Sequence, residues 1–149
     1  MHLSDTELFL QYAGLILALI SLIYLAIQTA RNTKISRATF WLDLRERFAA
    51  YDDVHLKLRP GGEWTLPNAG PKTAAEWMRV EAYMGLFEHC NIMLTDKLID
   101  INTFHKVYRY RLHNIVSNET IKNAKLKDPA LNQNWVEFIQ LLNRCYIKY

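Results

Sequence analysis

The sequence contains little cysteine, glycine or proline, and these shortages exclude several kinds of site. Only two cysteines occur among 149 residues, without metal-ligand spacing or a CxxC pair, which argues against a disulfide framework or a zinc site. We expect Cys90 and Cys145 to be reduced thiols packed as small apolar groups. Gly61-Gly62 opens no helix, so it is typical of a turn and not of a phosphate-binding loop. No Ser/His/Asp arrangement is recognisable, and we expect no metal and no cofactor.

Charge is also absent from 23 consecutive positions, residues 8–30, which read LFLQYAGLILALISLIYLAIQTA. About 20 apolar residues suffice to cross the hydrocarbon core of a bilayer. A secretory signal peptide would have a basic start and a shorter apolar core, whereas the leader MHLSDTE is acidic. We therefore predict a short extracytoplasmic N-terminus at residues 1–7, a transmembrane helix at 8–30 and a cytoplasmic helical domain at 31–149.

No lysine or arginine precedes Arg31, and this asymmetry predicts the orientation. Arg31, Lys34 and Arg37 follow the span at once, while Asp5 and Glu7 precede it. The positive-inside rule then places the N-terminus outside and the domain in the cytoplasm, on the cytoplasmic (inner) membrane. The remainder carries all 18 basic residues against 13 of the 15 acidic ones, about +5. That bias suits contact with anionic membrane lipid, and it is too weak to indicate nucleic acid by itself.

The span carries a stripe of polar and small residues: Gln11, Gly14, Ala18, Ser21 and Gln28. Their heptad-like spacing places them on one helical face. Small residues let helix backbones approach closely, and glutamine side chains in lipid need a hydrogen-bond partner. Three interpretations of the stripe are open. It forms helix–helix contacts within a homo-oligomer, or it lines a narrow pore. In the third, the glutamines simply extend to the membrane interface and the small residues are incidental.

Neither glycine nor proline occurs between Ala30 and Leu58, and the segment has a broadly helical apolar stripe. We expect the membrane helix to continue unbroken to Leu58 and to stop at Arg59-Pro60. A loop of about 13 residues, long enough to be functional or mobile, follows.

Four further helices are predicted, so the fold class is all-α, a membrane helix continuing into a helical bundle. The first begins at Thr73, which forms a capping-box pair with Glu76. The others span residues 103–116 and 119–126 and a C-terminal segment. Predicted core positions are Trp77, Val80, Met84, Phe87, Asn91, Leu94, Phe104, Val107, Tyr108, Leu112, Ile115, Trp135, Phe138, Ile139, Leu142 and Tyr146.

The densest polar and aromatic patch is FHKVYRYRLHN, residues 104–114. On a helix His105, Arg109 and His113 lie four residues apart and share a face. One interpretation is a solvated face. A second is a surface for RNA phosphates, anionic lipid or a nucleotide, formed by His105, Arg109, Arg111 and His113 with tyrosines for stacking. A third is a catalytic site.

Arg111 falls near the apolar side of this helix. In the first interpretation it reaches back to Glu81 or Glu88, because a partly buried guanidinium needs a carboxylate.

The catalytic interpretation rests on a resemblance. An arginine followed by a histidine on a late helix of a small bundle resembles the motif of the higher-eukaryote and prokaryote nucleotide-binding (HEPN) ribonucleases. In that family the arginine–histidine pairs of two chains together form a metal-independent RNA-cleaving site. The resemblance implies that His113 moves protons and Arg109 stabilises phosphorane charge. Here three residues separate the pair, where the family usually has at least four, and Tyr110 replaces the usual polar residue. We therefore expect no enzyme activity, with Arg109 and His113 as degenerate catalytic candidates.

Two further resemblances concern layout. The order of membrane helix, FWLDLRERF-type helix, YRYRLHNIVSN helix and terminal Trp-containing helix is similar to that of an uncharacterised bacterial family of single-pass proteins. The layout also resembles the small accessory membrane protein of type VI-B CRISPR systems, which places a divergent HEPN-like bundle after one membrane helix. That resemblance implies a homo-oligomeric pore that depolarises the membrane in antiviral defence. We expect a protein or RNA activator and no DNA; the alternative is a membrane-tethered HEPN-like ribonuclease or RNA-binding domain.

Overall fold

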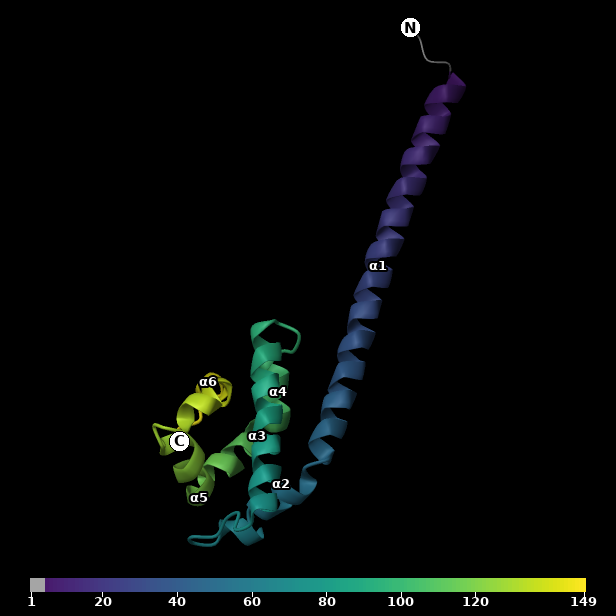
Figure 1. The fold of residues 1–149 in the computed structure, drawn as a ribbon. Helices are drawn as coiled ribbons and strands as arrows, with labels where there is room; N and C mark the ends of the chain where they lie inside the picture. Colours follow the sequence, from purple (N-terminus) through teal and green to yellow (C-terminus); the bar gives the residue numbers. More distant parts are fainter. Residues whose placement is uncertain (1–4) are drawn as a thin grey trace. The chain divides into compact units, whose positions relative to one another are not determined.

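A computed structural model describes residues 5–149, with side chains from Phe9 onward. Every regular element in this part of the chain is helical, as the sequence predicts (Figure 1). The chain divides after Leu42 into two compact units, which we describe separately. Residues 1–4 of the predicted external segment lie outside the described part.

The first helix, α1 (Asp5–Ala49), contains the whole predicted membrane segment, residues 8–30, and begins within the predicted leader. Its 45 residues include no proline, so no backbone donor is missing from the helical ladder. The predicted continuation beyond Ala30 is confirmed as far as Ala49. A turn at Ala50–Tyr51 then separates α1 from a second helix, α2 (Asp52–Leu58), so the prediction of one unbroken helix to Leu58 is wrong.

The loop after α2 contains a short 3-10 turn, η1 (Glu63–Thr65). Gly62 is required there, because a Cβ at this position would lie 2.4 Å from the carbonyl oxygens of Leu56 and Lys57. Trp64 turns inward and is only 3% exposed. The loop is therefore anchored to the domain through its indole ring.

Helix α3 (Ala74–Thr95) begins as predicted with a capping box. The Glu76 amide donates to Thr73 Oγ1 at 3.2 Å, and the Thr73 amide donates to a Glu76 carboxylate oxygen at 3.2 Å. The predicted inward face from Val80 to Leu94 is buried, with Trp77 partly exposed. Hydrophobic periodicity was sufficient to predict this helix.

Helix α4 (Ile101–Ser117) is slightly longer than the predicted 103–116, because Asp100 caps it by accepting from the Thr103 amide at 2.8 Å. Phe104, Tyr108, Leu112 and Ile115 are buried as predicted. Val107 is 45% exposed, so its assignment to the core is wrong.

The C-terminal part is less regular than predicted. In place of one helix over 119–126 there is a short α5 (Glu119–Ile121) followed by a π-helical turn, η2 (Lys122–Lys127). A 3-10 turn, η3 (Asn132–Trp135), leads into α6 (Val136–Arg144). Tyr146, predicted to be in the core, follows α6 with a positive φ of 54° and is 84% exposed.

Two arginines hold the turn between α1 and α2. Arg79 of α3 donates through Nη2 to the Ala50 carbonyl at 2.6 Å and pairs with the Asp53 carboxylate. Arg111 of α4 pairs with Asp52 at 3.0 Å. The turn contains neither glycine nor proline. Tertiary contacts, and not local propensity, therefore account for the end of α1.

The core of the second unit is a cluster of aromatic rings. Its members come from the end of α1, α3, α4 and α6: Phe48, Tyr83, Phe87, Phe104, Tyr108 and Phe138. Helix α3 packs most extensively against α6. Both cysteines are free and buried in this unit, as predicted. Burial raises the pKa of the Cys90 thiol to about 12, so it stays protonated.

Candidate functional site

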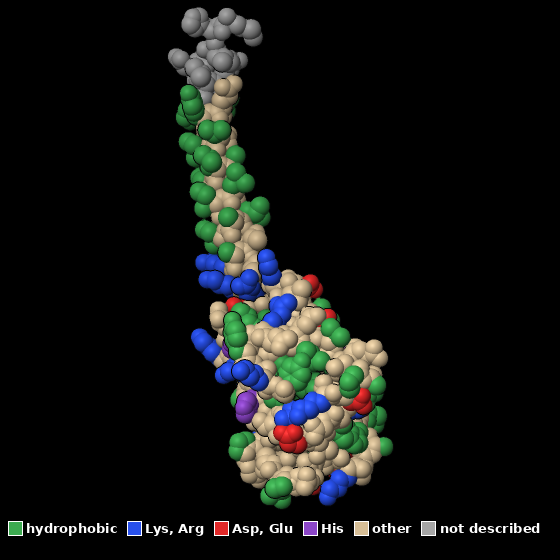
Figure 2. Space-filling model, turned by 90° about the vertical axis from the view of Figure 1, so that its left-hand side faces the viewer, with side chains coloured by type: hydrophobic (Ala, Val, Ile, Leu, Met, Phe, Trp, Pro, Cys, Tyr) green, Lys and Arg blue, Asp and Glu red, His purple; other side chains and the backbone are tan. Residues whose placement is uncertain are grey.

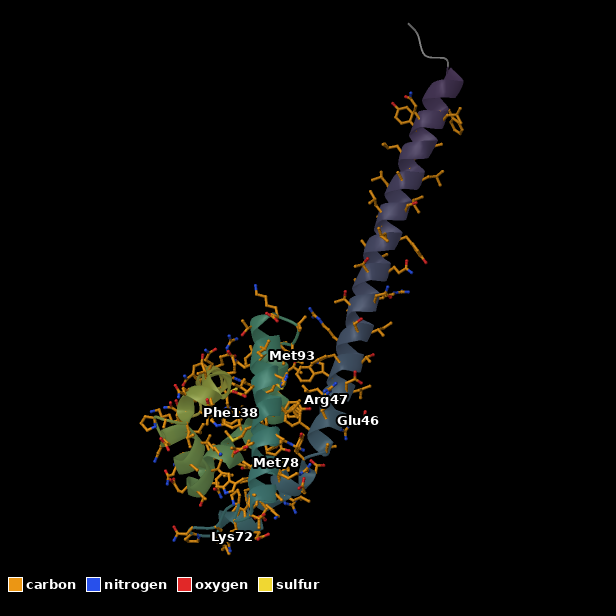
Figure 3. The ribbon with its side chains drawn as sticks, viewed as in Figure 1. Glu46, Arg47, Lys72, Met78, Met93 and Phe138 are labelled. Carbon is orange, nitrogen blue, oxygen red and sulfur yellow. The ribbon has the colours of Figure 1, made fainter. Side chains whose placement is uncertain are left out.

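The apolar part of α1 exposes its large side chains instead of burying them. From Phe9 to Ile27 each large apolar side chain is between 50% and 72% exposed. Side chains project from all sides of this part of the helix (Figure 3), and apolar ones cover its visible face (Figure 2). The most apolar stretch of this helix has a mean hydropathy of 2.2. By length and composition, the helix can therefore cross a membrane.

The predicted stripe on this helix lies fully on the surface. Ser21 donates its hydroxyl to the Leu17 carbonyl at 2.8 Å, so its hydrogen is satisfied within the helix. Neither Gln11 nor Gln28 makes a side-chain hydrogen bond within the described part of the chain. A Cβ at Gly14 would meet nothing within 4 Å. Glycine inside a helix costs about 0.5–1 kcal/mol relative to alanine, and packing within one chain gives no reason for it.

The second candidate site is an open cavity of about 330 Å³ on one face of α4. It is lined by His105, Lys106, Arg109, Tyr110, His113 and Asn114. The structure therefore brings together three of the four predicted ligand residues, His105, Arg109 and His113. Two of the lining polar atoms, His105 Nε2 and Asn114 Nδ2, are buried and have no hydrogen-bond partner among the described residues.

Neighbouring groups orient the Arg109 and His113 side chains. Arg109 Nε donates to the Cys145 carbonyl at 3.1 Å, which ties α4 to the end of α6. Ser117 donates its hydroxyl to the His113 carbonyl at 2.8 Å, and its oxygen lies 3.2 Å from His113 Nδ1. Because the single hydroxyl hydrogen is already used, Nδ1 acts as the donor in this pair. When the ring is neutral, this pairing makes Nε2 the acceptor nitrogen, which is available to a hydrogen bond from a ligand.

Arg111 does not belong to this cavity. Its Nη2 pairs with Asp52, its Nε donates to the Tyr110 hydroxyl at 3.2 Å, and its guanidinium lies 5.8 Å from the centre of the Phe48 ring. The prediction that it pairs with Glu81 or Glu88 is wrong, because α2 and not α3 supplies its carboxylate. Glu81 pairs with Lys125 instead.

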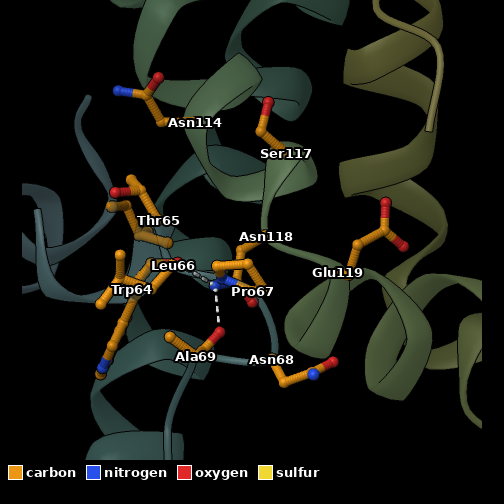
Figure 4. A pocket seen from close by; sticks show the side chains of 11 residues that line it. Trp64, Thr65, Leu66, Pro67, Asn68, Ala69, Asn114, Ser117, Asn118 and Glu119 are labelled. Carbon is orange, nitrogen blue, oxygen red and sulfur yellow. Dashed lines mark hydrogen bonds between the residues drawn. The ribbon is translucent and has the colours of Figure 1, made fainter. Parts of the chain in front are cut away.

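A smaller cavity of about 270 Å³ lies between the end of α4 and the loop at residues 64–69 (Figure 4). Asn114 lines both cavities. The buried Asn118 holds the loop by donating to the carbonyls of Trp64 and Ala69, both at 2.9 Å.

Sequence reasoning missed Asn114 and the loop residues of the smaller cavity. Asn114 falls one residue after the predicted face, and no spacing marks it as a cavity residue. For Asn118 the sequence holds a usable signal, because an asparagine directly before a helix is a preferred N-cap, and Asn118 caps α5.

No group of three His, Cys, Asp or Glu side chains within the described residues could hold a metal ion. Comparisons with protein-family models, with curated proteins and with solved structures find no match to this chain.

Proposed function

We propose that this protein is a single-pass membrane protein whose N-terminal helices associate through the Gln11–Gln28 stripe into a homo-oligomeric bundle. The observation that carries the proposal is the exposed helix with Gly14 and two glutamines on one face that make no side-chain hydrogen bond with any described residue. In hydrocarbon such amides need partners, and a second copy of the same helix supplies them. The basic residues after the span support placing the second unit in the cytoplasm, at the inner membrane.

The same stripe can line a pore. A bundle with inward-facing Gln11, Ser21 and Gln28 presents rings of polar groups to a narrow channel, which then conducts small ions. We propose that the assembly permeabilises or depolarises the membrane. The resemblance of its layout to that of the type VI-B CRISPR accessory proteins supports antiviral defence as the proposed setting, with a protein or RNA activator acting on the cytoplasmic domain.

The test is ion flux from vesicles that contain the purified full chain. We expect flux from the unchanged protein and its loss in the double variant Gln11→Leu/Ser21→Leu. Tyr12→Leu is the matched control, since it also removes a polar group but lies on the other side of the helix. Absence of flux from the unchanged protein would contradict the pore, and equal flux from the double variant would contradict the assignment of the stripe.

The α4 cavity favours a second candidate function, binding of RNA or another phosphate-bearing ligand. Basic side chains of α4 line it, and two buried nitrogens, His105 Nε2 and Asn114 Nδ2, have no hydrogen-bond partner among residues 5–149. An arginine beside a histidine with a free Nε2 could also support phosphoryl chemistry in the membrane-tethered ribonuclease alternative.

Binding and cleavage of labelled single-stranded RNA test this candidate. If the cavity binds phosphate, Arg109→Ala weakens binding roughly tenfold. His113→Ala should abolish any cleavage. Lys97→Ala and His89→Ala, at exposed positions elsewhere, are the controls. RNA binding that is unaffected by Arg109→Ala would rule out the cavity as the site.

A further inference from the structure

Three basic side chains follow the apolar part of α1: Arg31, Lys34 and Arg37. All three are exposed, and none forms an ion pair within the described part of the chain. No aspartate or glutamate occurs between residues 31 and 42. Figure 2 shows Lys and Arg side chains gathered where the apolar covering of the helix ends. Within the described residues, therefore, no carboxylate pairs with the basic side chains of this segment.

The axial positions of the three residues match the headgroup layer of a bilayer. With a rise of about 1.5 Å per residue, Arg31 and Arg37 lie about 9 Å apart along the helix. The polar layer on each side of the hydrocarbon is about 5–8 Å thick. If residues 8–30 fill the hydrocarbon, Arg31 and Lys34 lie within this polar layer. Arg37 lies about 10 Å beyond the hydrocarbon, at the outer edge of the layer, from where its long side chain reaches back to the phosphates.

The three residues also lie on one side of the helix. At about 100° per residue they cover an arc of about 120°, and neighbours three apart can reach one ligand together. The centre of this arc lies about 170° from the centre of the Gln11–Gln28 stripe by the same projection. If the stripe faces other copies in a bundle, the basic side chains face away from it, towards lipid.

We propose that Arg31, Lys34 and Arg37 form a binding site for the phosphate headgroups of anionic phospholipids on the outer surface of the assembly. The inference rests on the proposed membrane span. Arginine offers a planar set of donors for phosphate oxygens and lysine a point charge, so neighbouring side chains can hold one phosphate between them. Zwitterionic headgroups carry a compensating cation, so the site prefers lipids with net negative charge.

The test is native mass spectrometry of the full chain in detergent with equal amounts of phosphatidylglycerol and phosphatidylcholine. A basic residue near an anionic surface contributes about fivefold to binding, so we expect the unchanged protein to prefer phosphatidylglycerol at least about tenfold. In the variant Arg31→Gln/Lys34→Gln/Arg37→Gln the preference falls to near unity. High salt also reduces it, because these groups are exposed.

Two control variants separate a site from general charge. Arg59→Gln/Lys97→Gln/Lys148→Gln removes the same charge from exposed positions of the second unit and keeps the preference. The variant Arg31→Lys/Arg37→Lys preserves the charge at the site and should also keep most of the preference for phosphatidylglycerol. Equal binding of the two lipids to the unchanged protein, or an equal loss of preference in the control triple variant, would overturn the inference.

The oligomeric mass measured in the same spectra separates this inference from the proposed assembly. An oligomer without lipid preference overturns only the lipid site. A monomer that still selects phosphatidylglycerol supports the lipid site and contradicts the homo-oligomer.

Discussion

The two units of this chain treat apolar side chains in opposite ways. From Phe9 to Ile27 the large apolar side chains are half or more exposed, whereas Tyr83, Phe87 and Phe138 in the second unit are fully buried. Helix α3 is also long and rich in apolar residues, yet it buries one face against α6. Exposure, and not composition, therefore distinguishes the helix that needs an external apolar phase from the helix that belongs to a core.

The largest expected effect comes from charging the exposed apolar helix. In Leu19→Lys/Leu22→Lys each lysine near the middle of a span costs about 3 kcal/mol of insertion free energy. We expect the variant to appear in the soluble fraction after cell lysis, measured by sedimentation and immunoblot. The matched variant Leu56→Lys/Leu98→Lys, at exposed positions of the second unit, should stay with the membrane. If both variants stayed in the membrane fraction, the assignment of residues 8–30 as a transmembrane helix would be contradicted.

The next effect is on the aromatic core. Phe87 is fully buried and its ring contacts those of Phe48, Tyr83, Phe104 and Phe138. Phe87→Ala should lower the free energy of unfolding of the second unit by about 3–5 kcal/mol, because it leaves a cavity among these rings.

Urea unfolding of the full chain in detergent measures this change. Leu17→Ala in the exposed part of α1 should leave the transition of the second unit unchanged. A similar loss in both variants would show that the two regions do not differ as described.

A smaller effect is expected at Asn118. Its side chain caps α5 by accepting from the Ile121 amide at 2.9 Å, and it donates to two loop carbonyls. Asn118→Ala should cost about 2 kcal/mol of unfolding free energy, since it removes a cap and leaves buried carbonyls unpaired. The exposed Asn123→Ala serves as the control. Equal melting temperatures for the two variants would disprove this role.

The smallest effect concerns pH. Burial, followed by the nearby Arg111, lowers the pKa of His55 below its ordinary value of 6.5, and Asp52 opposes the shift. The unfolded chain therefore takes up a proton before the folded one, so His55 destabilises the second unit as the pH falls below 6.5. His55→Gln should flatten the decline in melting temperature between pH 7 and pH 5. His89→Gln, at an exposed site, should retain the decline seen in the unchanged protein.

Much of the architecture could be predicted from local pattern. The uncharged run predicted one long apolar N-terminal helix, and the Thr73–Glu76 capping box predicted the start of α3. The inward faces of α3 and α4 followed from helical periodicity, with Val107 as the exception.

What could not be predicted depends on contacts between distant residues. Arg79 and Arg111 create the turn after Ala49, and nothing in the local sequence marks it. The predicted pairing of Arg111 with Glu81 or Glu88 was wrong for the same reason. Its partner, Asp52, belongs to α2, which was not expected to exist as a separate helix. In the α4 cavity, shared spacing grouped His105, Arg109 and His113, whereas Asn114 follows Tyr110 by four residues, on a neighbouring row of the same helix.

The most direct test of the central proposal is the mass of the full chain after extraction into mild detergent. For the unchanged protein we predict a mass that is a discrete multiple of the 17.5 kDa chain mass. In the variant Gly14→Leu/Ala18→Leu the measured mass should fall towards that of one chain, because the bulky leucines keep the helices from approaching closely. A single-chain mass for the unchanged protein across all concentrations would contradict the homo-oligomer and, with it, the pore.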